Sequence, residues 1–538
     1  MSIATLTLAY AFIAIVLFPF TGAYDRQIAN EGTTSPHVQH EVSVTTIGAP
    51  KYNNFKSRGS RGIVGIGKHL DHLFTIPITV GDQVFSVNLD TGSSDLWLIS
   101  ENCQTNACKE SNVPRYSASA FSAADVDVEM QYGDSKTGTF AQGTIGFDTA
   151  TISNISMVHQ PFALIDDTSN LIVQFGATGI FGLGFPTASS VQGSILGTTI
   201  DSATDIDNYV DSMGSHGPLI SRIAMAGALD APMFSLSLQR DERDPTRTEK
   251  TGFLTLGKLP HGIDNSSLTW VPVRLYAVED GGMGPPSFAA DEVYPYRWEI
   301  DIEGVFLDGE RLPETTIPAN GVDSKRVSAL IDTGNSLIRG PEDVVVNLLQ
   351  TISPGFNPSV EGSVPAVPCN VPRTLEFQIG GQMFPIDPRD FISQLDLENA
   401  IDCQADNLVP ADPSAYGALF RWSLGTPFFK SNFVAFHYGN LTHPSVDPPR
   451  IGFLSRVPSN AGVLLQNAVR DAMQYMVDVN NGVDNIDPPN VAHTTAQTNT
   501  ILGDMLDSRV AANHSSTLYA SNYLPVLIHV AILISFYI

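Results

Sequence analysis

VNLDTGSS (residues 87–94) and ALIDTGNS (residues 329–336) are the two stretches that decide the fold of this chain. Each is an apolar, strand-like run that leads into Asp-Thr-Gly and then a small polar residue. A carboxylate directly after an apolar strand would be costly if it were buried alone. Two copies, 242 residues apart, therefore predict two similar lobes that bring Asp90 and Asp332 to a shared interface.

The sequence around this repeat is also strand-like. Residues 73–98 alternate apolar and polar side chains around a Gly-Asp turn, which predicts two strands and a hairpin. Similar short runs occur at residues 125–132, 253–256, 298–307 and 433–438. A helical period is clearest at residues 342–352 and 461–477. We therefore expect a mainly β protein with a few short helices.

Composition narrows the class of protein. The chain has 538 residues, enough for two to four packing units, and 43% of them are hydrophobic while only 16% are charged. This balance excludes a disordered protein. The net charge of −27 excludes an electrostatic nucleic-acid binder.

Four cysteines exclude a dense disulfide scaffold and allow three pairings. Nearest-neighbour pairing, Cys103 with Cys108 and Cys369 with Cys403, is the simplest. A zinc site is the rival interpretation, although no CxxC or HxxxH motif accompanies these cysteines.

At the two Asp-Thr-Gly motifs the chain resembles the pepsin-family (A1-type) aspartic proteases, over about residues 70–456. Trp97 follows the first motif at the family spacing, and QYGD (residues 131–134) resembles the flap hairpin with its tyrosine. The run GIFGLG (residues 179–184) matches the segment behind the first aspartate, and IGF (residues 451–453) resembles the last strand. The resemblance implies a bilobal fold with an active-site cleft between two similar β lobes. It also places the four cysteines in a small and a larger disulfide loop.

The resemblance implies that Asp90 and Asp332 form the catalytic pair of an aspartic endopeptidase. Two carboxylates a few ångströms apart cannot both ionise and so share one proton, an effect for which aspartic proteases are themselves the standard illustration. One carboxylate then takes a proton from water while its partner gives one to the peptide carbonyl. Neither a metal nor another cofactor is expected.

Other residues enter as support for this pair. Ser93 is expected to donate its hydroxyl to Asp90, and Gly92 and Gly334 let the backbone approach the carboxylates closely. Asn335 stands where the family usually has Thr or Ser, and its amide can still donate to a carboxylate. The full set of support residues is Thr91, Gly92, Ser93, Trp97, Thr333, Gly334 and Asn335.

The flap is expected at Tyr132, Gly133 and Asp134, with Tyr132 closing over the substrate. Trp97 would be the hydrogen-bond partner of Tyr132, or only a core residue. Asp134 could bind a Lys or Arg that precedes the cleaved bond; Lys136 shares its strand face and could neutralise it. Asp134 could also be a solvated hairpin charge with no role.

Three further departures from the family pattern stand out. SLGT (residues 423–426) replaces the usual apolar residue followed by Leu-Gly-Asp. Residues 190–217 and 279–292 are rich in Gly, Ser and Asp and are expected to be inserted surface loops.

Both chain ends carry targeting patterns. Residues 1–23 have a short apolar core ending in small residues, which is typical of a secretory signal, with a retained anchor as the alternative. Residues 514–538 end in an apolar tail after a polar spacer, which is typical of a GPI-anchor signal removed on maturation. Asn513 is the favoured attachment site, with Ser508 or Ser515 as alternatives; a retained tail anchor is the rival interpretation.

The remaining segments of the chain lie between these two targeting sequences. Residues 24–69 carry six basic and three acidic side chains and precede an acidic body. They resemble a propeptide; the alternative interpretation is a disordered leader. We expect catalytic lobes at residues 70–250 and 251–456 and a polar stalk at 457–513. Glycosylation sequons stand at Asn154, Asn265 and Asn440.

Two functions from different classes compete. The first is an active protease of the secretory pathway, GPI-anchored at the extracellular face of the plasma membrane or in the wall, an arrangement resembling the fungal yapsin-like surface proteases. The second is a catalytically inactive pepsin-fold protein for binding or adhesion. The expected partners are protein or peptide substrates and the anchoring membrane, with no nucleic acid, and the chain is expected to be a monomer.

Overall fold

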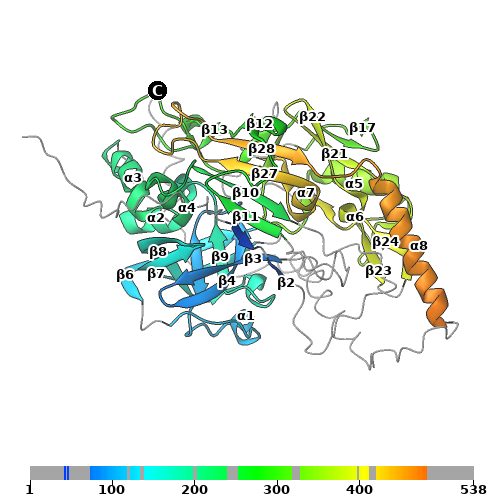
Figure 1. Cartoon of the computed structure of the whole chain (residues 1–538), viewed down its shortest axis with the longest axis horizontal. Helices are drawn as coiled ribbons and strands as arrows, with labels where there is room; N and C mark the ends of the chain where they lie inside the picture. Colours follow the sequence, from blue (N-terminus) through cyan, green and yellow to red (C-terminus); the bar gives the residue numbers. More distant parts are fainter. Residues whose placement is uncertain are drawn as a thin grey trace, which may run out of the picture. The chain divides into compact units, whose positions relative to one another are not determined.

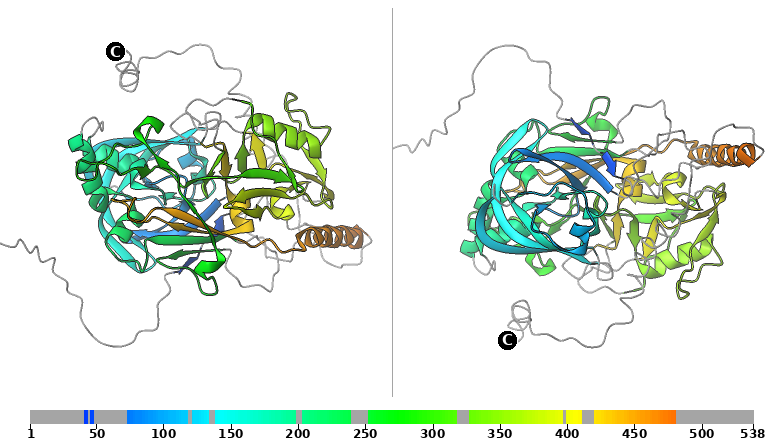
Figure 2. Two further views of the ribbon diagram at one scale, coloured as in Figure 1. Left: turned by 90° about the horizontal axis from the view of Figure 1, so that it is seen from above. Right: turned by 90° about the horizontal axis from the view of Figure 1, so that it is seen from below.

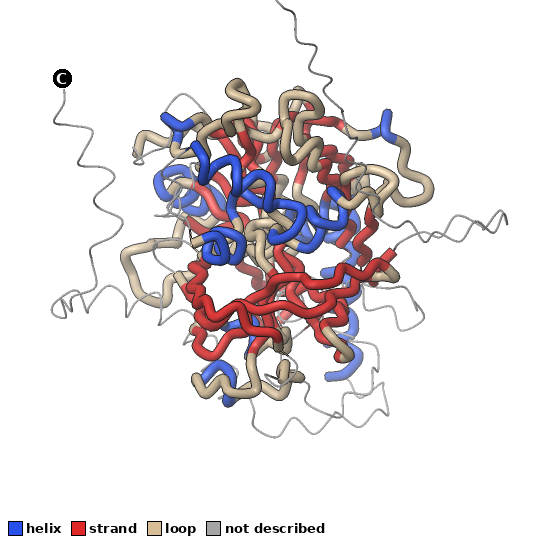
Figure 3. The backbone as a smooth tube through the Cα atoms, turned by 90° about the vertical axis from the view of Figure 1, so that its left-hand side faces the viewer, coloured by secondary structure: helices blue, strands red, loops and turns tan. Residues whose placement is uncertain are grey.

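The computed structural model of this chain describes residues 41–43, 45–47, 73–117, 121–133, 138–197, 203–238, 252–317, 327–396, 399–410 and 420–480. Strands dominate these ranges, as the colouring by secondary structure in Figure 3 shows. The prediction of a mainly β, bilobal fold is confirmed.

One eight-stranded sheet builds the N-terminal lobe (Figure 1). Its strands, in spatial order, are β2 (Thr45–Ile47), β3 (Leu73–Val80), β4 (Gln83–Asp90), β9 (Gly179–Gly182), β5 (Leu96–Ile99), β8 (Ile155–Thr168), β7 (Thr139–Ile152) and β6 (Ser122–Tyr132). The predicted hairpin is β3–β4, and Gly81 supplies the positive φ of 63° that its tight turn requires. The long cyan strands β6–β8 curve along this lobe in Figure 2.

Three sheets belong to the C-terminal lobe. The five-stranded sheet has the order β15 (Glu299–Asp301), β18 (Ser328–Ile331), β26 (Trp422–Leu424), β19 (Ile338–Gly340) and β25 (Leu408–Pro410). The four-stranded sheet consists of β17 (Glu310–Arg311), β16 (Gly304–Leu307), β21 (Leu375–Ile379) and β22 (Gln382–Pro385). The third contains β20 (Ala366–Pro368), β24 (Asn399–Gln404) and β23 (Ser393–Asp396).

A six-stranded sheet combines strands from distant parts of the sequence. Its order is β1 (Glu41–Ser43), β11 (Gly252–Leu256), β10 (Met233–Leu238), β27 (Asn432–His437), β28 (Arg450–Ser455) and β12 (Thr269–Pro272). A separate pair is formed by β13 (Leu275–Tyr276) and β14 (Tyr294–Pro295). In addition to the pairing of β1 with β11, β2 pairs with β3, so the described part of the predicted propeptide segment adds strands to two sheets.

The sequence repeat appears in space as a repeated three-stranded module. In the N-terminal lobe, β9 pairs parallel with β4 and antiparallel with β5. In the C-terminal lobe, β26 pairs parallel with β18 and antiparallel with β19. Each module carries one Asp-Thr-Gly motif at the end of its first strand, so the two lobes present their aspartates in the same way.

The helices only partly follow the sequence pattern. Their bounds are α1 (Asn106–Lys109), α2 (Ser190–Leu196), α3 (Ala203–His216), α4 (Leu219–Met225), α5 (Glu342–Ile352), α6 (Pro388–Phe391), α7 (Thr426–Ser431) and α8 (Ala461–Asn480). The predicted helices at 342–352 and 461–477 are α5 and α8.

The prediction of an inserted surface loop at residues 190–217 is wrong, because this segment contains α2 and α3. The Gln192 side chain donates to the Tyr209 carbonyl and to the Ser212 hydroxyl, at 2.9 Å each. Tyr209, Val210 and Met213 are buried together, so a few large apolar residues stabilise α3 despite its many small polar ones.

Helix α8 packs on the C-terminal lobe through a helical stripe of buried residues, Leu465, Val469 and Ala472. The predicted polar stalk therefore begins with a packed helix, and its residues after 480 lie outside the described part of the chain. Among the described residues, no helix combines the length and hydropathy needed to cross a membrane.

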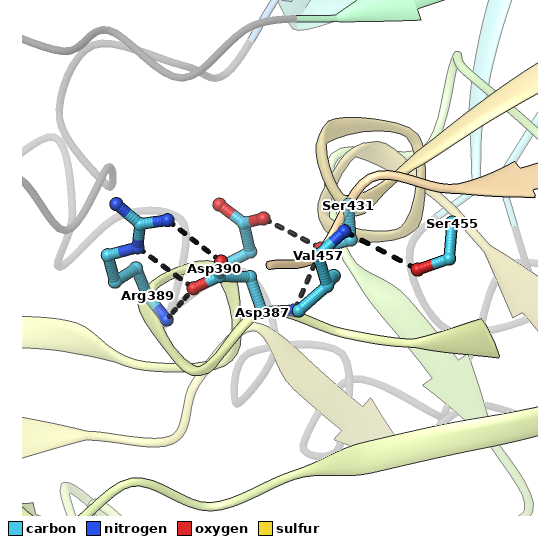
Figure 4. A network of polar contacts seen from close by, with 6 residues as sticks. All are labelled: Asp387, Arg389, Asp390, Ser431, Ser455 and Val457. Carbon is cyan, nitrogen blue, oxygen red and sulfur yellow. Dashed lines mark hydrogen bonds and ion pairs between the residues drawn. The ribbon is translucent and has the colours of Figure 1, made fainter. Parts of the chain in front are cut away.

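A buried polar network fixes α6, on which α8 packs (Figure 4). The Ser431 hydroxyl donates to Asp390 at 2.7 Å and accepts from the backbone N–H of Asp387 at 2.9 Å. Asp387 also accepts two hydrogen bonds from the Arg389 guanidinium, at 2.9 Å each. The bonds of Ser431, the last residue of α7, attach α6 to α7, and the Asp387–Arg389 pair neutralises the buried charge at the start of α6.

Candidate active site

Four buried hydrogen bonds join the two Asp-Thr-Gly loops. The Thr91 backbone N–H donates to the Thr333 hydroxyl and the Thr333 N–H to the Thr91 hydroxyl, both at 3.0 Å. The Thr91 hydroxyl then donates to the Ile331 carbonyl and the Thr333 hydroxyl to the Leu89 carbonyl, both at 2.8 Å. Each threonine therefore links its own loop to the strand that carries the other aspartate.

The glycines of both motifs lie directly against the carboxylate of the other lobe. A Cβ at Gly92 would lie 2.5 Å from the Asp332 carboxyl group, and one at Gly334 would lie 2.4 Å from Asp90 Oδ1. No side chain fits at these distances, so glycine is required at both positions for close approach.

This approach brings Asp90 and Asp332 within hydrogen-bonding reach of one another. Asp90 Oδ1 accepts from the Gly92 N–H, and Asp332 Oδ1 accepts from the Gly334 N–H, both at 2.8 Å. Burial raises the pKa of both carboxyl groups, and the neighbouring charge of Asp90 raises the pKa of Asp332 further. At a pH between its two titration steps, the pair therefore holds one shared proton and one negative charge.

The two aspartates differ in their third neighbour. The Ser93 hydroxyl donates to Asp90 Oδ2 at 2.5 Å. The expectation that the Asn335 amide donates to Asp332 is not met. Its NH₂ group donates instead to the Ser423 hydroxyl, at 2.9 Å, because Ser423 offers a buried acceptor on the neighbouring strand.

Tyr132, at the end of β6, lies within range of the charges of Asp90 and Asp95. The Trp97 indole N–H donates to the Tyr132 hydroxyl at 2.8 Å, and the indole is fully buried, so Trp97 is both a core residue and a hydrogen-bond partner. Burial and the charges of Asp90 and Asp95 raise the pKa of Tyr132 well above its ordinary value, which keeps the phenol protonated. Gly133 follows with a positive φ of 83°, whereas Asp134 lies outside the described residues.

Both predicted disulfides are present, Cys103–Cys108 and Cys369–Cys403, and the described part of the chain holds no free cysteine. This pairing removes the zinc alternative for these four residues.

Of the sequon asparagines, Asn154 and Asn265 are exposed. Asn440 is half-buried, and its side-chain oxygen accepts from the backbone N–H groups of Thr442 and His443. Asn513, the favoured anchor attachment site, lies outside the described residues.

Asp95, to which no sequence motif pointed, is buried behind the first loop. It accepts hydrogen bonds from the Ser189 hydroxyl at 2.5 Å and from the Ser190 N–H at 2.7 Å, at the start of α2. Burial raises its pKa to about 6. Its place five residues after Asp90 was visible in the sequence, but its partners lie about 95 residues away.

No sequence motif pointed to Trp298 either. Its indole N–H donates to the Leu183 carbonyl at 2.8 Å, and its own carbonyl accepts from the Ile331 N–H, one residue before Asp332. The Tyr438 hydroxyl donates to the same Leu183 carbonyl at 2.7 Å. These bonds connect the two lobes behind the aspartates, and no local sequence signal predicts them.

The two similar lobes and the paired, proton-sharing aspartates define a protein of the aspartic-protease type. A family model described as "Eukaryotic aspartyl protease" matches residues 73–443. The chain belongs to this family.

Curated relatives include a pepsin A, a gastricsin and a chymosin. Pepsin A of Sus scrofa is 26% identical over 374 residues, which cover 69% of this chain and 79% of pepsin A. Gastricsin of Macaca fuscata fuscata is 28% identical over 382 residues, 69% of this chain and 83% of gastricsin. Chymosin of Bos taurus is 26% identical over 395 residues, 72% of this chain and 84% of chymosin. Homology thus supports an aspartic-type peptide hydrolase.

Proposed function

We propose that this chain is an active aspartic endopeptidase that cleaves peptide bonds in acid, after secretion and anchoring at the cell surface. The observation that carries the proposal is the hydrogen-bonding contact between Asp90 and Asp332, each of which also accepts a backbone hydrogen bond. Water held between the two oxygens would lose a proton to the ionised carboxylate, and the protonated partner would donate to the peptide carbonyl.

Replacement of either aspartate tests catalysis. Asp90→Asn or Asp332→Asn should lower kcat/KM for a peptide substrate by at least about 100-fold. An asparagine can neither take a proton from water nor give one to the peptide carbonyl, so the general acid–base pair is lost. Asp167→Asn, at an exposed position on β8, is the matched control and should keep parental activity. A statine-type inhibitor, whose hydroxyl takes the place of the attacking water, should block the parent.

The alternative function is a non-catalytic binding or adhesion protein with the same fold. It predicts no cleavage of a peptide library by the purified parent between pH 2 and 7, and unchanged surface binding in both aspartate variants. Cleavage that persists undiminished in either variant would overturn the proposed mechanism.

The proposed glycolipid anchor is supported by the polar spacer and apolar tail at residues 514–538. Phosphatidylinositol-specific phospholipase C should release the protein from membranes, and an Asn513→Gln variant should be released less efficiently if Asn513 is the attachment site. Detection of residues 523–538 in the mature protein by mass spectrometry would refute the anchor.

Maturation by removal of a basic leader is supported by the charge contrast between residues 24–69 and the acidic body. Acidification protonates carboxylates and weakens this attraction, so a new N-terminus between residues 56 and 68 should appear in acid. A precursor that stays intact at pH 4 would argue against a zymogen.

Asp134 is also proposed to let the enzyme accept a Lys or Arg beside the cleaved bond. This proposal is supported by the flap sequence alone. Asp134→Ala should then lower cleavage of Lys-containing peptides relative to Phe-containing ones. An unchanged ratio would remove Asp134 from substrate selection.

A further inference from the structure

The third residue after each catalytic aspartate is held in a different way in the two lobes. Ser93 uses its hydroxyl on Asp90 Oδ2. Asn335 occupies the same position after Asp332, is only 9% exposed, and directs its NH₂ group to Ser423, with Nδ2 2.9 Å from the hydroxyl and 3.4 Å from the carbonyl oxygen.

The other end of the Asn335 amide is occupied as well. Its Oδ1 accepts from the Leu337 N–H at 3.1 Å and from Arg339 Nε at 3.2 Å. A guanidinium and a backbone N–H can only donate, so the amide oxygen must face them and the NH₂ group must face Ser423. Turning the buried amide toward Asp332 would leave these donors unsatisfied, which is costly.

The partners of Asn335 come from the module that the two lobes share. Ser423 on β26 is the register partner of Arg339 on β19. In the N-terminal lobe the same pairing joins Ile180 on β9 to Trp97 on β5. Ile180 and Trp97 cannot offer position 93 the hydroxyl acceptor and guanidinium donor that Ser423 and Arg339 offer to Asn335. Ser423, Arg339 and Asn335 therefore act together. We call Asn335, Ser423 and Arg339 the amide clamp.

We propose that the amide clamp is a positioning device: it withholds a side-chain hydroxyl donor from Asp332, keeps the shared proton on Asp332, and extends activity toward higher pH. The proposal rests on the proposed protease function. Asp90 keeps the hydroxyl of Ser93, which favours its ionised form, whereas position 335 gives Asp332 a backbone N–H and no side-chain donor. Asp332 is then the acid and Asp90 the base at the start of the reaction.

Charged and titratable groups approach Asp332 from several elements. Asp90 faces it from the loop after β4, and Arg297 interacts electrostatically with both aspartates from the segment before β15. Arg339 reaches the region through Asn335, and the protonated Tyr132 lies beside Asp90. Replacing Asn335 leaves Asp90 and Arg297 in place but removes the acceptor of Arg339. Asn335→Ala, which frees Arg339 without adding a hydroxyl, is therefore the reference against which the effect of the hydroxyl is measured.

Asn335→Ser copies the N-terminal arrangement and tests the proposal. A serine hydroxyl that donates to Asp332 stabilises its carboxylate, so the alkaline limb of the kcat/KM profile should move down by about 0.5–1 pH unit. The double variant Asn335→Ser with Ser423→Val removes the unused hydroxyl, as Ile180 does on the other side, and should show the same shift. Asn335→Thr provides the same hydroxyl if Asn335→Ser lowers Tm strongly.

A buried asparagine of the same lobe supplies the control. Asn407 donates its amide to the Asp390 carbonyl at 2.8 Å, away from the aspartates. Asn407→Ser should lower Tm and leave the pH profile in place. A shift of equal size in Asn407→Ser would show that the effect is structural and would overturn the proposal.

A measurement independent of activity separates this proposal from the protease function. The infrared band of the protonated carboxyl pair, identified by its loss in Asp332→Asn, should disappear at a lower pH in Asn335→Ser than in the parent. The band can be followed even if the parent cleaves nothing, in which case only the proposed function fails. Folded Asn335→Ser and Asn335→Thr proteins whose band and alkaline limb match those of the parent would overturn the amide clamp and leave the protease function intact.

Discussion

The loop after β4 and the loop after β18 begin with the same Asp-Thr-Gly and then diverge. Their threonines form mirrored hydrogen bonds, and a Cβ at either glycine would lie at nearly the same distance from the opposite carboxylate. Beyond the glycine, Ser93 binds its own aspartate while Asn335 binds the neighbouring strand. The shared part holds the two lobes together at the aspartates, and the divergent part makes the two aspartates chemically unequal.

The largest effect is expected from breaking the symmetric part. Thr91→Ala and Thr333→Ala should each lower the free energy of unfolding by about 2–4 kcal/mol, because each leaves a buried N–H and a buried C=O without a partner. Denaturant unfolding should give nearly the same value for the two variants.

The Thr→Ser changes at both positions are the controls. They keep the hydroxyl and should cost only about 1 kcal/mol for the lost methyl group. Clearly unequal losses in the two alanine variants would show that the cross-lobe linkage is not symmetric.

The next effect concerns Asp95, which has a raised pKa of about 6. A raised folded-state pKa means that its stabilising contribution is complete below about pH 4 and is lost as pH rises through about 6. For this buried group the free energy of unfolding changes by about 3 kcal/mol across that pH range. Asp95→Asn should therefore flatten the stability curve between pH 4 and 6.

The Asp95→Asn side chain keeps one acceptor and loses the other, so the absolute stability of the variant protein is expected to fall. The informative quantity is the slope of unfolding free energy with pH. A slope equal to that of the parent would show that another group controls stability in this range.

The smallest effect sharpens the difference between the loops. Ser93→Ala removes the hydroxyl from Asp90 and should move the titration of the aspartate pair up by about 0.5–1 pH unit, opposite in sign to Asn335→Ser. The pH dependence of the carboxyl infrared band measures this shift. Shifts of the same sign in both variants would contradict unequal aspartates.

Local patterns predicted much of the fold because they involve neighbouring residues. The β3–β4 hairpin follows from alternation around Gly81, and α5 and α8 follow from their apolar periods. Helices α2 and α3 were missed because small polar residues dilute the same signal, and their stability comes from burial of Tyr209 and its neighbours.

By itself, the sequence determined the two lobes, the aspartate pair and the glycines beside them, since each depends on a short motif or a motif repeat. The cysteine pairing was the simplest of three that the sequence allowed. Tertiary structure alone decided the partners of Asn335 and Asp95. Ser423 lies 88 residues from Asn335 and Ser189 lies 94 residues from Asp95, and only the strand order of each lobe brings them into contact. A buried amide or carboxylate takes the hydrogen-bond partners that the fold supplies, and these partners set its charge and its role.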